Sequence, residues 1–232
     1  MANMQLDIDK YLFKGTAFLD LLSPREKKQV LASVVRKEYK KGQVLFKEGF
    51  YSRGVYILRK GKVKLFQTER NGKDNVVYIY KKGDYFGYRP LLCEEPHPAT
   101  ASAIDNVVVF FLPESVFSAL LKSSNTLARQ LLINLSHEFT VWINKLTLFT
   151  QYSVKERVAL TLLILSADST EKGDKKPIIS VNREDLAGFA ATTKETLVRM
   201  LRLMKDNKTI TTKGTKIQVL KRQELLKMVE TF

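Results

Sequence analysis

The spacing of apolar residues changes from one region of the chain to the next, and each spacing predicts a different kind of element. Up to about residue 36 the pattern is helical. Ser23 and Glu26 form a capping-box pattern around Pro24, a residue favoured at the first position of a helix. Apolar residues follow at helical spacing: Val30, Leu31, Val34 and Val35. The N-terminal region is therefore expected to form a short helical lead-in.

From Glu38 to Pro113 the pattern becomes that of β-strands. Short runs of β-branched and aromatic residues, such as Val55–Leu58 and Val76–Tyr80, are separated by glycines. Asn71-Gly72 is a pair that favours a two-residue hairpin turn. Because many short strands occur without the helical crossovers that parallel strands need, we expect a small antiparallel barrel or roll.

Helical spacing returns from Pro113 to about Gln151. An apolar seam advances there in alternating steps of four and three residues, which is the period of about 3.5 residues found in paired helices. The seam begins at Ala128. We expect its remaining members to form a dimer interface: Leu132, Leu135, Phe139, Trp142, Leu146 and Phe149. The alternative is a helix that packs this seam against its own domain.

Two short helices are predicted between residues 182 and 204. Asn182 is expected to cap the first helix, with Asp185 three residues later. Thr192 is expected to cap the second, with Glu195 completing a capping box. An apolar stripe follows on the second helix: Leu197, Met200, Leu201 and Met204. This pattern predicts a helix-turn-helix.

With that stripe buried, the opposite face of the second helix is free to enter the major groove of DNA. The outward residues are Thr193, Lys194, Glu195, Thr196 and Arg199. Basic side chains can donate to guanine, Glu can accept from cytosine, and a threonine methyl can contact thymine. Next, Thr209–Val219 predicts a hairpin, or wing, with its turn at Lys213-Gly214. We expect Lys213 and Lys216 to contact phosphates.

The charge of the chain agrees with a DNA-binding role. Its 232 residues carry a formal net charge of +15, which favours polyanionic partners. Nine of the basic residues lie between Thr192 and Arg222, against only Glu195 and Asp206, a local excess of +7. A solvated basic face on a small structural domain is the alternative reading of this excess.

Other features narrow the function classes. The single cysteine, Cys93, allows no intramolecular disulfide and no cysteine-ligated zinc or iron–sulfur site within one chain. The N-terminus lacks the apolar segment of a signal peptide, and no apolar run is long enough to span a bilayer. We therefore expect a cytoplasmic protein without membrane contacts. No nucleophile elbow, phosphate-binding glycine loop or metal-ligand spacing occurs, so we do not expect an enzyme.

The chain resembles the CRP/FNR superfamily of regulators over nearly its whole length. Gly83–Gly87 resembles the phosphate-cassette signature of that family, and Ala99–Ala101 resembles the closing strand of the cassette. Lys194-Glu195-Thr196 with Arg199 resembles its recognition-helix signature. The resemblance implies an α+β fold with three parts. These are an N-terminal antiparallel, cyclic-nucleotide-binding-like sensor β-roll (1–120), a long dimerisation helix (121–152) and a C-terminal winged helix-turn-helix (153–232).

The resemblance also implies an effector pocket in the roll. Its expected residues are Gly87, Tyr88, Arg89, Ala99, Thr100 and Trp142. Cyclic-AMP-binding members have a glutamate after the cassette glycine and an arginine before the closing strand, and this chain has neither. We therefore expect that cyclic AMP is not the ligand, and we predict no cofactor. One hypothesis is that Tyr88, Phe139 and Trp142 fill the pocket themselves. His97 and Cys93, near the cassette, leave haem as an open alternative.

The function implied is that of a homodimeric, sequence-specific transcription regulator with an effector-sensing roll. Its expected partners are a palindromic site on double-stranded DNA, a second copy of the chain and, for an activator, RNA polymerase. The alternative is a ligand-sensing regulatory subunit of an enzyme or channel that does not bind DNA. The identity of the effector, the operator sequence and the direction of regulation stay open.

Overall fold

The computed structural model describes residues 7–13, 16–168 and 177–229, with the exception of the side chains of Phe149 and Asp168. Contacts divide the chain into two compact units. The first, called the roll unit, comprises Lys14–His137. The second, called the C-terminal unit, combines Met1–Phe13 with Glu138–Phe232. The boundary between the units lies within one long helix, α4 (Asn125–Gln151).

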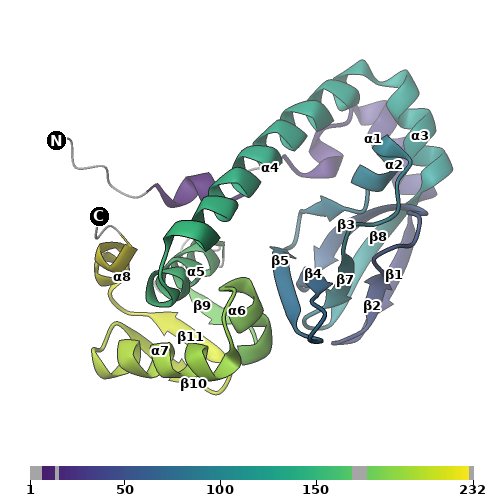
Figure 1. Cartoon of the computed structure of the whole chain (residues 1–232). Helices are drawn as coiled ribbons and strands as arrows, with labels where there is room; N and C mark the ends of the chain where they lie inside the picture. Colours follow the sequence, from purple (N-terminus) through teal and green to yellow (C-terminus); the bar gives the residue numbers. More distant parts are fainter. Residues whose placement is uncertain (1–6, 14–15, 169–176, 230–232) are drawn as a thin grey trace. The chain divides into compact units, whose positions relative to one another are not determined.

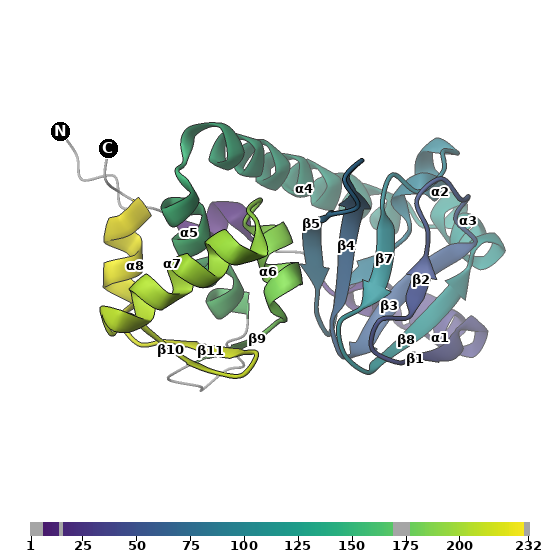
Figure 2. The same cartoon turned by 60° about the horizontal axis from the view of Figure 1, so that its bottom comes forward.

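The roll unit contains two antiparallel four-stranded sheets (Figure 2). One sheet has the strand order β1-β8-β3-β6, and the other has the order β2-β7-β4-β5. The strands of the first are β1 (Val35–Tyr39), β3 (Gly54–Lys60), β6 (Tyr85–Phe86) and β8 (Val107–Pro113). Those of the second are β2 (Val44–Phe46), β4 (Val63–Thr68), β5 (Asp74–Tyr80) and β7 (Thr100–Ala103). The antiparallel roll expected from the glycine-separated strands is confirmed.

The turn at Asn71-Gly72 differs from its prediction. The pairing of β4 with β5 ends at Thr68 opposite Asp74, so the loop is Glu69–Lys73 rather than two residues. The Asn71 side chain accepts a hydrogen bond from the Lys73 amide at 2.9 Å. This Asx turn holds the wider loop, because the side-chain oxygen takes the place of a backbone acceptor.

Aromatic rings fill the space between the two sheets. Tyr56 and Phe86 stack with ring centroids 5.4 Å apart, and Phe86 stacks on Tyr80 at 4.5 Å. Tyr56 also meets Phe111 edge to face at 5.0 Å. Its hydroxyl donates to the Leu45 carbonyl at 3.1 Å, so the polar end of this buried ring is satisfied. The roll therefore has a packed interior of its own.

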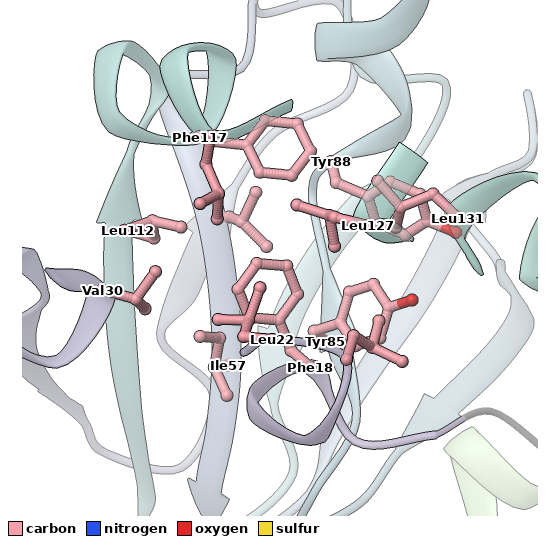
Figure 3. Close-up of a cluster of buried hydrophobic side chains, with 13 residues drawn as sticks. Phe18, Leu22, Val30, Ile57, Tyr85, Tyr88, Leu112, Phe117, Leu127 and Leu131 are labelled. Atoms are coloured by element: carbon pink, nitrogen blue, oxygen red, sulfur yellow. The ribbon is translucent and has the colours of Figure 1, made fainter. Parts of the chain in front are cut away.

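A second core joins the first sheet to the helices of the roll unit (Figure 3). Phe18, Val30, Ile57, Phe117 and Leu127 are among its buried members. The helices are η2 (Phe18–Asp20), α1 (Pro24–Ser33), α2 (Arg89–Cys93), α3 (Glu114–Ser123) and the first part of α4. Each helix packs apolar side chains against the sheet. Without the helices, that face of the four-stranded sheet would be exposed to water.

The N-terminal helix begins as predicted and ends earlier. Ser23 accepts from the Glu26 amide and the Glu26 carboxylate accepts from the Ser23 amide, so the capping box is confirmed. The helix ends at Ser33, and Val35 starts strand β1 opposite Phe111. The prediction of helix through Val35 was wrong, because pairing with β8 takes precedence over helical spacing at this position.

The C-terminal unit is a helical bundle with a small sheet (Figure 1). Its sheet has the order β10-β11-β9, with β9 (Ile178–Ser180), β10 (Ile210–Lys213) and β11 (Lys216–Val219). Its helices are η1 (Ile8–Tyr11), α5 (Val154–Asp168), α6 (Arg183–Phe189), α7 (Lys194–Asp206) and α8 (Arg222–Val229). Every residue of α5 from Val158 to Leu165 is buried, so this helix is surrounded by the rest of the unit. Together with the roll and the long helix, this arrangement confirms the α+β fold class.

A buried lysine connects three segments of the C-terminal unit. Lys145 of α4 is 5% exposed. Its ammonium lies 4.7 Å from the ring centre of Phe189 in α6, 5.3 Å from that of Trp142 and 5.8 Å from that of Phe13. The Asn144 side chain donates to the Lys10 carbonyl at 2.9 Å. Cation–π contacts of this kind stabilise a desolvated ammonium, so the end of α4 is held against α6 and the N-terminal segment.

Candidate nucleic-acid interface

The first helix of the pair, α6, is capped as the sequence predicts. The Asn182 side chain accepts from the Asp185 amide at 2.8 Å and donates to the Asp185 carboxylate at 2.6 Å. The predicted apolar residues of this helix and its C-terminal cap, Leu186, Ala187 and Ala190, are buried. The first of these bonds satisfies one of the backbone amides that the start of a helix leaves free.

The cap of the second helix, α7, is shifted by one residue from its prediction. Thr193, and not Thr192, is the N-cap, and its hydroxyl accepts from the Thr196 amide at 3.2 Å. Thr192 is buried instead, at 7% exposed. Glu195 consequently lies one position too early for a capping box. Because Glu195 plays no part in the cap, its carboxylate is left on the outer surface of the helix.

The predicted outward face of α7 is present. Leu197, Leu201 and Met204 are buried, while Lys194, Glu195 and Arg199 are exposed and Thr196 is half-buried. Lys194 forms an ion pair with Glu184 of α6. A hydrogen bond from Lys194 lowers the pKa of Glu184, and the carboxylate raises the pKa of Lys194. Both groups therefore stay charged near neutral pH, and this exposed pair adds little to stability.

The turn between α6 and α7 contains a strained residue. Ala191 has φ +47°, a left-handed conformation that glycine adopts at lower cost. The Thr192 amide donates to the Ala187 carbonyl at 3.0 Å across this turn. The turn thus reverses the chain within a few residues and sets the crossing of the two helices.

The wing is the hairpin formed by β10 and β11. Lys213 pairs with Lys216, so the turn consists of Gly214 and Thr215 rather than Lys213-Gly214 as predicted. Gly214 has φ +57°, which is the conformation that such a turn requires. Lys213 and Lys216 are exposed on either side of the turn.

Sequence reasoning missed the residue that holds the wing. The Arg183 guanidinium donates to the Gly214 carbonyl at 3.0 Å and to the Thr215 carbonyl at 3.3 Å. Burial lowers the pKa of Arg183, although an arginine remains charged at any physiological pH. Arg183 directly follows the cap of α6, and only the fold brings this position beside residues 214 and 215. No local pattern in the sequence could have indicated the contact.

The residues of the expected dimer seam on α4 differ in how far their side chains are exposed. Leu132, Phe139 and Leu146, which are seven residues apart, are each 65–66% exposed. Leu135 packs against the helical core of the roll unit, and the Trp142 ring lies 5.9 Å from that of Phe13. Phe149 belongs to the expected seam, but its side chain lies outside the described residues. A row of large apolar side chains is therefore left open along one stripe of α4.

The residues expected to form the effector pocket fall into different surroundings. Gly87 and Ser52 are joined by a hydrogen bond from the Ser52 hydroxyl to the Gly87 carbonyl at 2.8 Å. Gly87 has φ +84°, a conformation that favours glycine, and a Cβ atom there would lie 3.1 Å from the Tyr56 ring. Thr100 is half-buried and its hydroxyl accepts from the Glu48 amide at 3.1 Å, while Arg89 is exposed. Ala99 is 3% exposed.

The aromatic residues predicted to fill the pocket do not act together. Tyr88 is 2% exposed and lies beside Tyr85, within the core that contains Leu127 and Leu131 (Figure 3). Phe139 is 66% exposed, and so it fills no interior space in this structure. Trp142 belongs to the C-terminal unit, where its ring lies beside Phe13 and Lys145. The hypothesis that these three rings jointly fill the pocket was therefore wrong for Phe139.

His97 and Cys93, which had left haem open, differ in their surroundings. His97 is 4% exposed and stacks on Phe46 with ring centroids 3.8 Å apart. Burial lowers the pKa of His97 to about 4. Cys93 is exposed, and its thiol donates to the Arg89 carbonyl at 3.3 Å. Within the described part of the chain, no three His, Cys, Asp or Glu side chains are grouped so that they could hold a metal ion.

None of the described helices combines the length and hydrophobicity needed to cross a membrane.

Two family models match separate parts of the chain. Residues 36–124 match the Cyclic nucleotide-binding domain, and residues 156–228 match the Crp-like helix-turn-helix domain. The first match covers the roll and the second covers the helix pair and the wing. Their order along the chain is the one that the sequence resemblance predicts.

Relatives match over most of their length. The "Fumarate and nitrate reduction regulatory protein" of Vibrio cholerae is 25% identical over 83% of this chain and 78% of its own. The "Cyclic AMP receptor protein" of Thermus thermophilus is 27% identical over 81% of this chain and 85% of its own. Among solved structures, FixK2 of Bradyrhizobium japonicum has the same fold. It superposes with a TM-score of 0.76 at 21% identity, covering 84% of this chain and 96% of FixK2.

The two family models, the regulators that match across both units and the shared fold agree with one another. The chain belongs to the CRP/FNR superfamily of DNA-binding transcription regulators, with a nucleotide-binding-like sensing domain.

Proposed function

We propose that the protein acts as a homodimer that reads a two-fold symmetric DNA site, with one α7 from each protomer in successive major grooves. The observation that carries this proposal is the exposed N-terminal face of α7 beside a basic wing. Because a dimer of this kind contacts two half-sites about one helical turn apart, the site would be an inverted repeat with 34–36 Å, roughly one turn, between half-site centres.

Three side chains of α7 would read bases. Arg199 has the forked donors that fit guanine, and Glu195 can accept from the cytosine amino group. Lys194 would exchange its ion pair with Glu184 for a contact to DNA, an exchange that costs little because both groups are exposed. Thr196 is half-buried at the edge of this face, where it can contact a phosphate or a base.

The remaining contacts would position the protein. Lys213 and Lys216 flank the tip of the wing, where ammonium groups can neutralise phosphates. Thr193 contributes chiefly as the cap of α7, since its hydroxyl is already engaged with the Thr196 amide.

The open stripe on α4 supports dimerisation. Leu132, Phe139 and Leu146 recur at every seventh residue, which is the spacing at which two parallel helices pack side chains into each other. An apolar row of this size is costly in water and is favourable when a second copy covers it.

We do not expect cyclic AMP to be the effector. The cyclic phosphate needs a cationic partner, and Arg89, the arginine that follows the cassette glycine most closely in the sequence, is exposed at the start of α2. The exposed carboxylates of Glu94 and Glu95 follow α2, where they would repel an anion. The residues of this chain therefore do not fit that ligand.

The role of a transcription regulator carries three further expectations. We expect a location in the cytoplasm, a contact with RNA polymerase if the protein activates transcription, and no enzymatic turnover.

Selection of duplexes from a random DNA pool tests the proposal. The purified parent protein is expected to enrich a two-fold symmetric sequence without an added ligand. Arg199→Ala is expected to lose that enrichment, by about 1–3 kcal/mol of discrimination at the base it reads. Arg129→Ala removes an equal charge from α4 in the other unit and serves as the matched control.

Two results would count against the proposal. Enrichment that is unchanged in Arg199→Ala would show that Arg199 is not a base reader. If the parent enriches nothing, the selection is repeated with a metabolite extract. Enrichment then would reveal a required effector, and continued absence would show that the helix-turn-helix does not read DNA.

A further inference from the structure

A groove runs between α7 and the first strand of the wing. It has a volume of about 300 Å³ and is bordered by Val198, Leu201, Arg202 and Lys205 of α7 and by Thr212 of β10. Arg183 and Asp206 complete its lining. Figure 2 shows α7 lying along the hairpin that carries this strand. We call this feature the α7–wing groove.

The lining of the groove is predominantly cationic. Arg202 and Lys205 are exposed, which leaves their charged groups accessible to a ligand. Against three basic side chains stands a single carboxylate, that of Asp206. Thr212 adds a hydroxyl that can donate one neutral hydrogen bond. A monoanionic phosphate diester matches this combination of charge and donors better than a neutral ligand does.

The groove has a fixed border. Arg183 donates hydrogen bonds to the carbonyls of Gly214 and Thr215, so the tip of the wing is attached to the start of α6. Because these hydrogen bonds hold the wing, the width of the groove is set before a ligand binds. A border that is already in place loses less entropy on binding than a flexible one.

The position of the groove identifies its ligand. A recognition helix lies in the major groove of DNA, and a wing beside it contacts the neighbouring backbone. The α7–wing groove lies beside the base-reading face, which is where the sugar–phosphate strand that borders the major groove would pass. We infer that the α7–wing groove receives one phosphate of that strand, with Arg202 and Lys205 as its cationic partners.

This inference rests on DNA binding by α7 but concerns different residues from those that read bases. Arg202 and Lys205 lie one to two turns beyond Arg199 on the helix, at the border with β10 rather than at the N-terminal face. A phosphate contact carries no sequence information. The groove should therefore contribute equally to the affinity for any duplex.

The salt dependence of DNA binding tests the inference. Each phosphate that a protein neutralises adds about 0.9 to the slope of log K against log salt concentration. The double variant Arg202→Gln/Lys205→Gln is expected to lower that slope by about 0.9 per protomer on both the selected sequence and a shuffled one. The affinity ratio between the two sequences is expected to stay unchanged. Arg202→Lys/Lys205→Arg, which keeps both charges, should retain the parental slope.

A matched control and an opposite substitution sharpen the test. Lys227→Gln removes an exposed cation from α8 and is expected to leave the slope unchanged. Asp206→Asn removes the only carboxylate of the lining, so DNA should bind more tightly to this variant. All of these positions are exposed, and a thermal melt of each variant confirms that it is folded.

Several outcomes would overturn the inference. One is a salt-dependence slope in the Arg202→Gln/Lys205→Gln variant that equals the slope of the parent protein. Another is a loss of affinity for the selected sequence alone, which would show that these residues read bases. A melting temperature raised by inorganic phosphate in the parent but not in the double variant, together with an unchanged slope, would assign the groove to a free anion. If the parent shows no sequence preference, base reading fails, while the slope on any duplex still decides the role of the groove.

Discussion

Ala191 is the residue at which the DNA-binding unit carries backbone strain. A left-handed conformation costs a residue with a Cβ atom roughly 1–2 kcal/mol, and glycine avoids this cost. The helix-turn-helix nevertheless folds around alanine here, because the capped helices on both sides and the buried residues Ala187 and Ala190 hold the turn in place.

Ala191→Gly is expected to stabilise the protein by about 0.5–1 kcal/mol, since the relief of strain exceeds the entropy that glycine loses on folding. Ala190→Gly is the control: Ala190 has φ −86° and offers no strain to relieve, so this variant should be destabilised. Urea unfolding measures both. A change of the same sign in the two variants would argue against strain at residue 191.

His97 is a second residue whose surroundings set a measurable property. Its ring is buried against Phe46, and burial lowers its pKa from 6.5 to about 4. In the folded protein the ring is therefore neutral at a pH at which the unfolded chain already binds a proton. The unfolded state binds more protons between these two pKa values, so stability falls as the pH falls.

Between about pH 6.5 and pH 4 the parent is expected to lose up to about 3 kcal/mol relative to His97→Gln, at about 1.4 kcal/mol for each pH unit. Above this range the difference between the two proteins should be constant. The free energies of unfolding in urea, measured at a series of pH values, provide the comparison. If the difference does not change as the pH is lowered, His97 is not buried in its neutral form.

At the scale of elements, α4 has two different roles along its length. Its first part contributes Leu127 and Leu131 to the core of the roll unit, and the buried Asn134 donates to the Tyr85 hydroxyl at 2.6 Å. Its last part is held against α6 through Lys145 and Phe189. A single continuous helix is thus part of both units.

Phe139→Glu should separate the proposed dimer while leaving each chain folded. Phe139 is 66% exposed in the single chain, so a charge there costs little except in a paired seam, where two carboxylates would face each other. His137→Glu lies on the opposite side of α4 and should remain dimeric. Sedimentation equilibrium with circular dichroism measures both properties. A dimeric Phe139→Glu variant, or dissociation of both variants, would place the interface elsewhere.

At the scale of the whole molecule, charge and interior packing belong to different units. The local excess of +7 between Thr192 and Arg222 is almost half of the net charge of +15, and it lies entirely within the C-terminal unit. The roll unit instead has an interior occupied by its own aromatic rings, among them Tyr56, Tyr80 and Phe86. The C-terminal unit thus carries the basic surface that suits a polyanion, and the roll unit has a sensing fold with a packed interior.

A ligand that binds only the folded state stabilises it, by about 2.7 kcal/mol when its concentration is a hundredfold above its Kd. Because we do not expect cyclic AMP to bind, it should leave the melting temperature unchanged. A selected DNA duplex should raise the melting temperature in the same assay and shows that the assay detects binding. A reproducible rise with cyclic AMP would refute our reading of the cassette.

The sequence by itself determined the features that depend on local spacing. The strand runs between glycines predicted the roll, and the caps at Ser23 and Asn182 were placed correctly. The stripe predicted for α7 marks the face on which this helix is buried, although one of its members, Met200, is only half-buried. These features could be read because the caps and the periodic faces of helices and strands depend on residues only a few positions apart.

Only the tertiary structure decided the features that depend on distant partners. Helix α1 ends at Ser33 because β1 pairs with β8, and Arg183 holds the wing because folding brings residues 214 and 215 beside it. Tyr88 was predicted as a pocket residue or as a ring that fills the pocket itself, and the fold places it among Tyr85, Leu127 and Leu131. The α7–wing groove likewise combines a helix with a strand. Contacts of this kind leave no periodic trace, because the residues that make them are separated by an arbitrary length of chain.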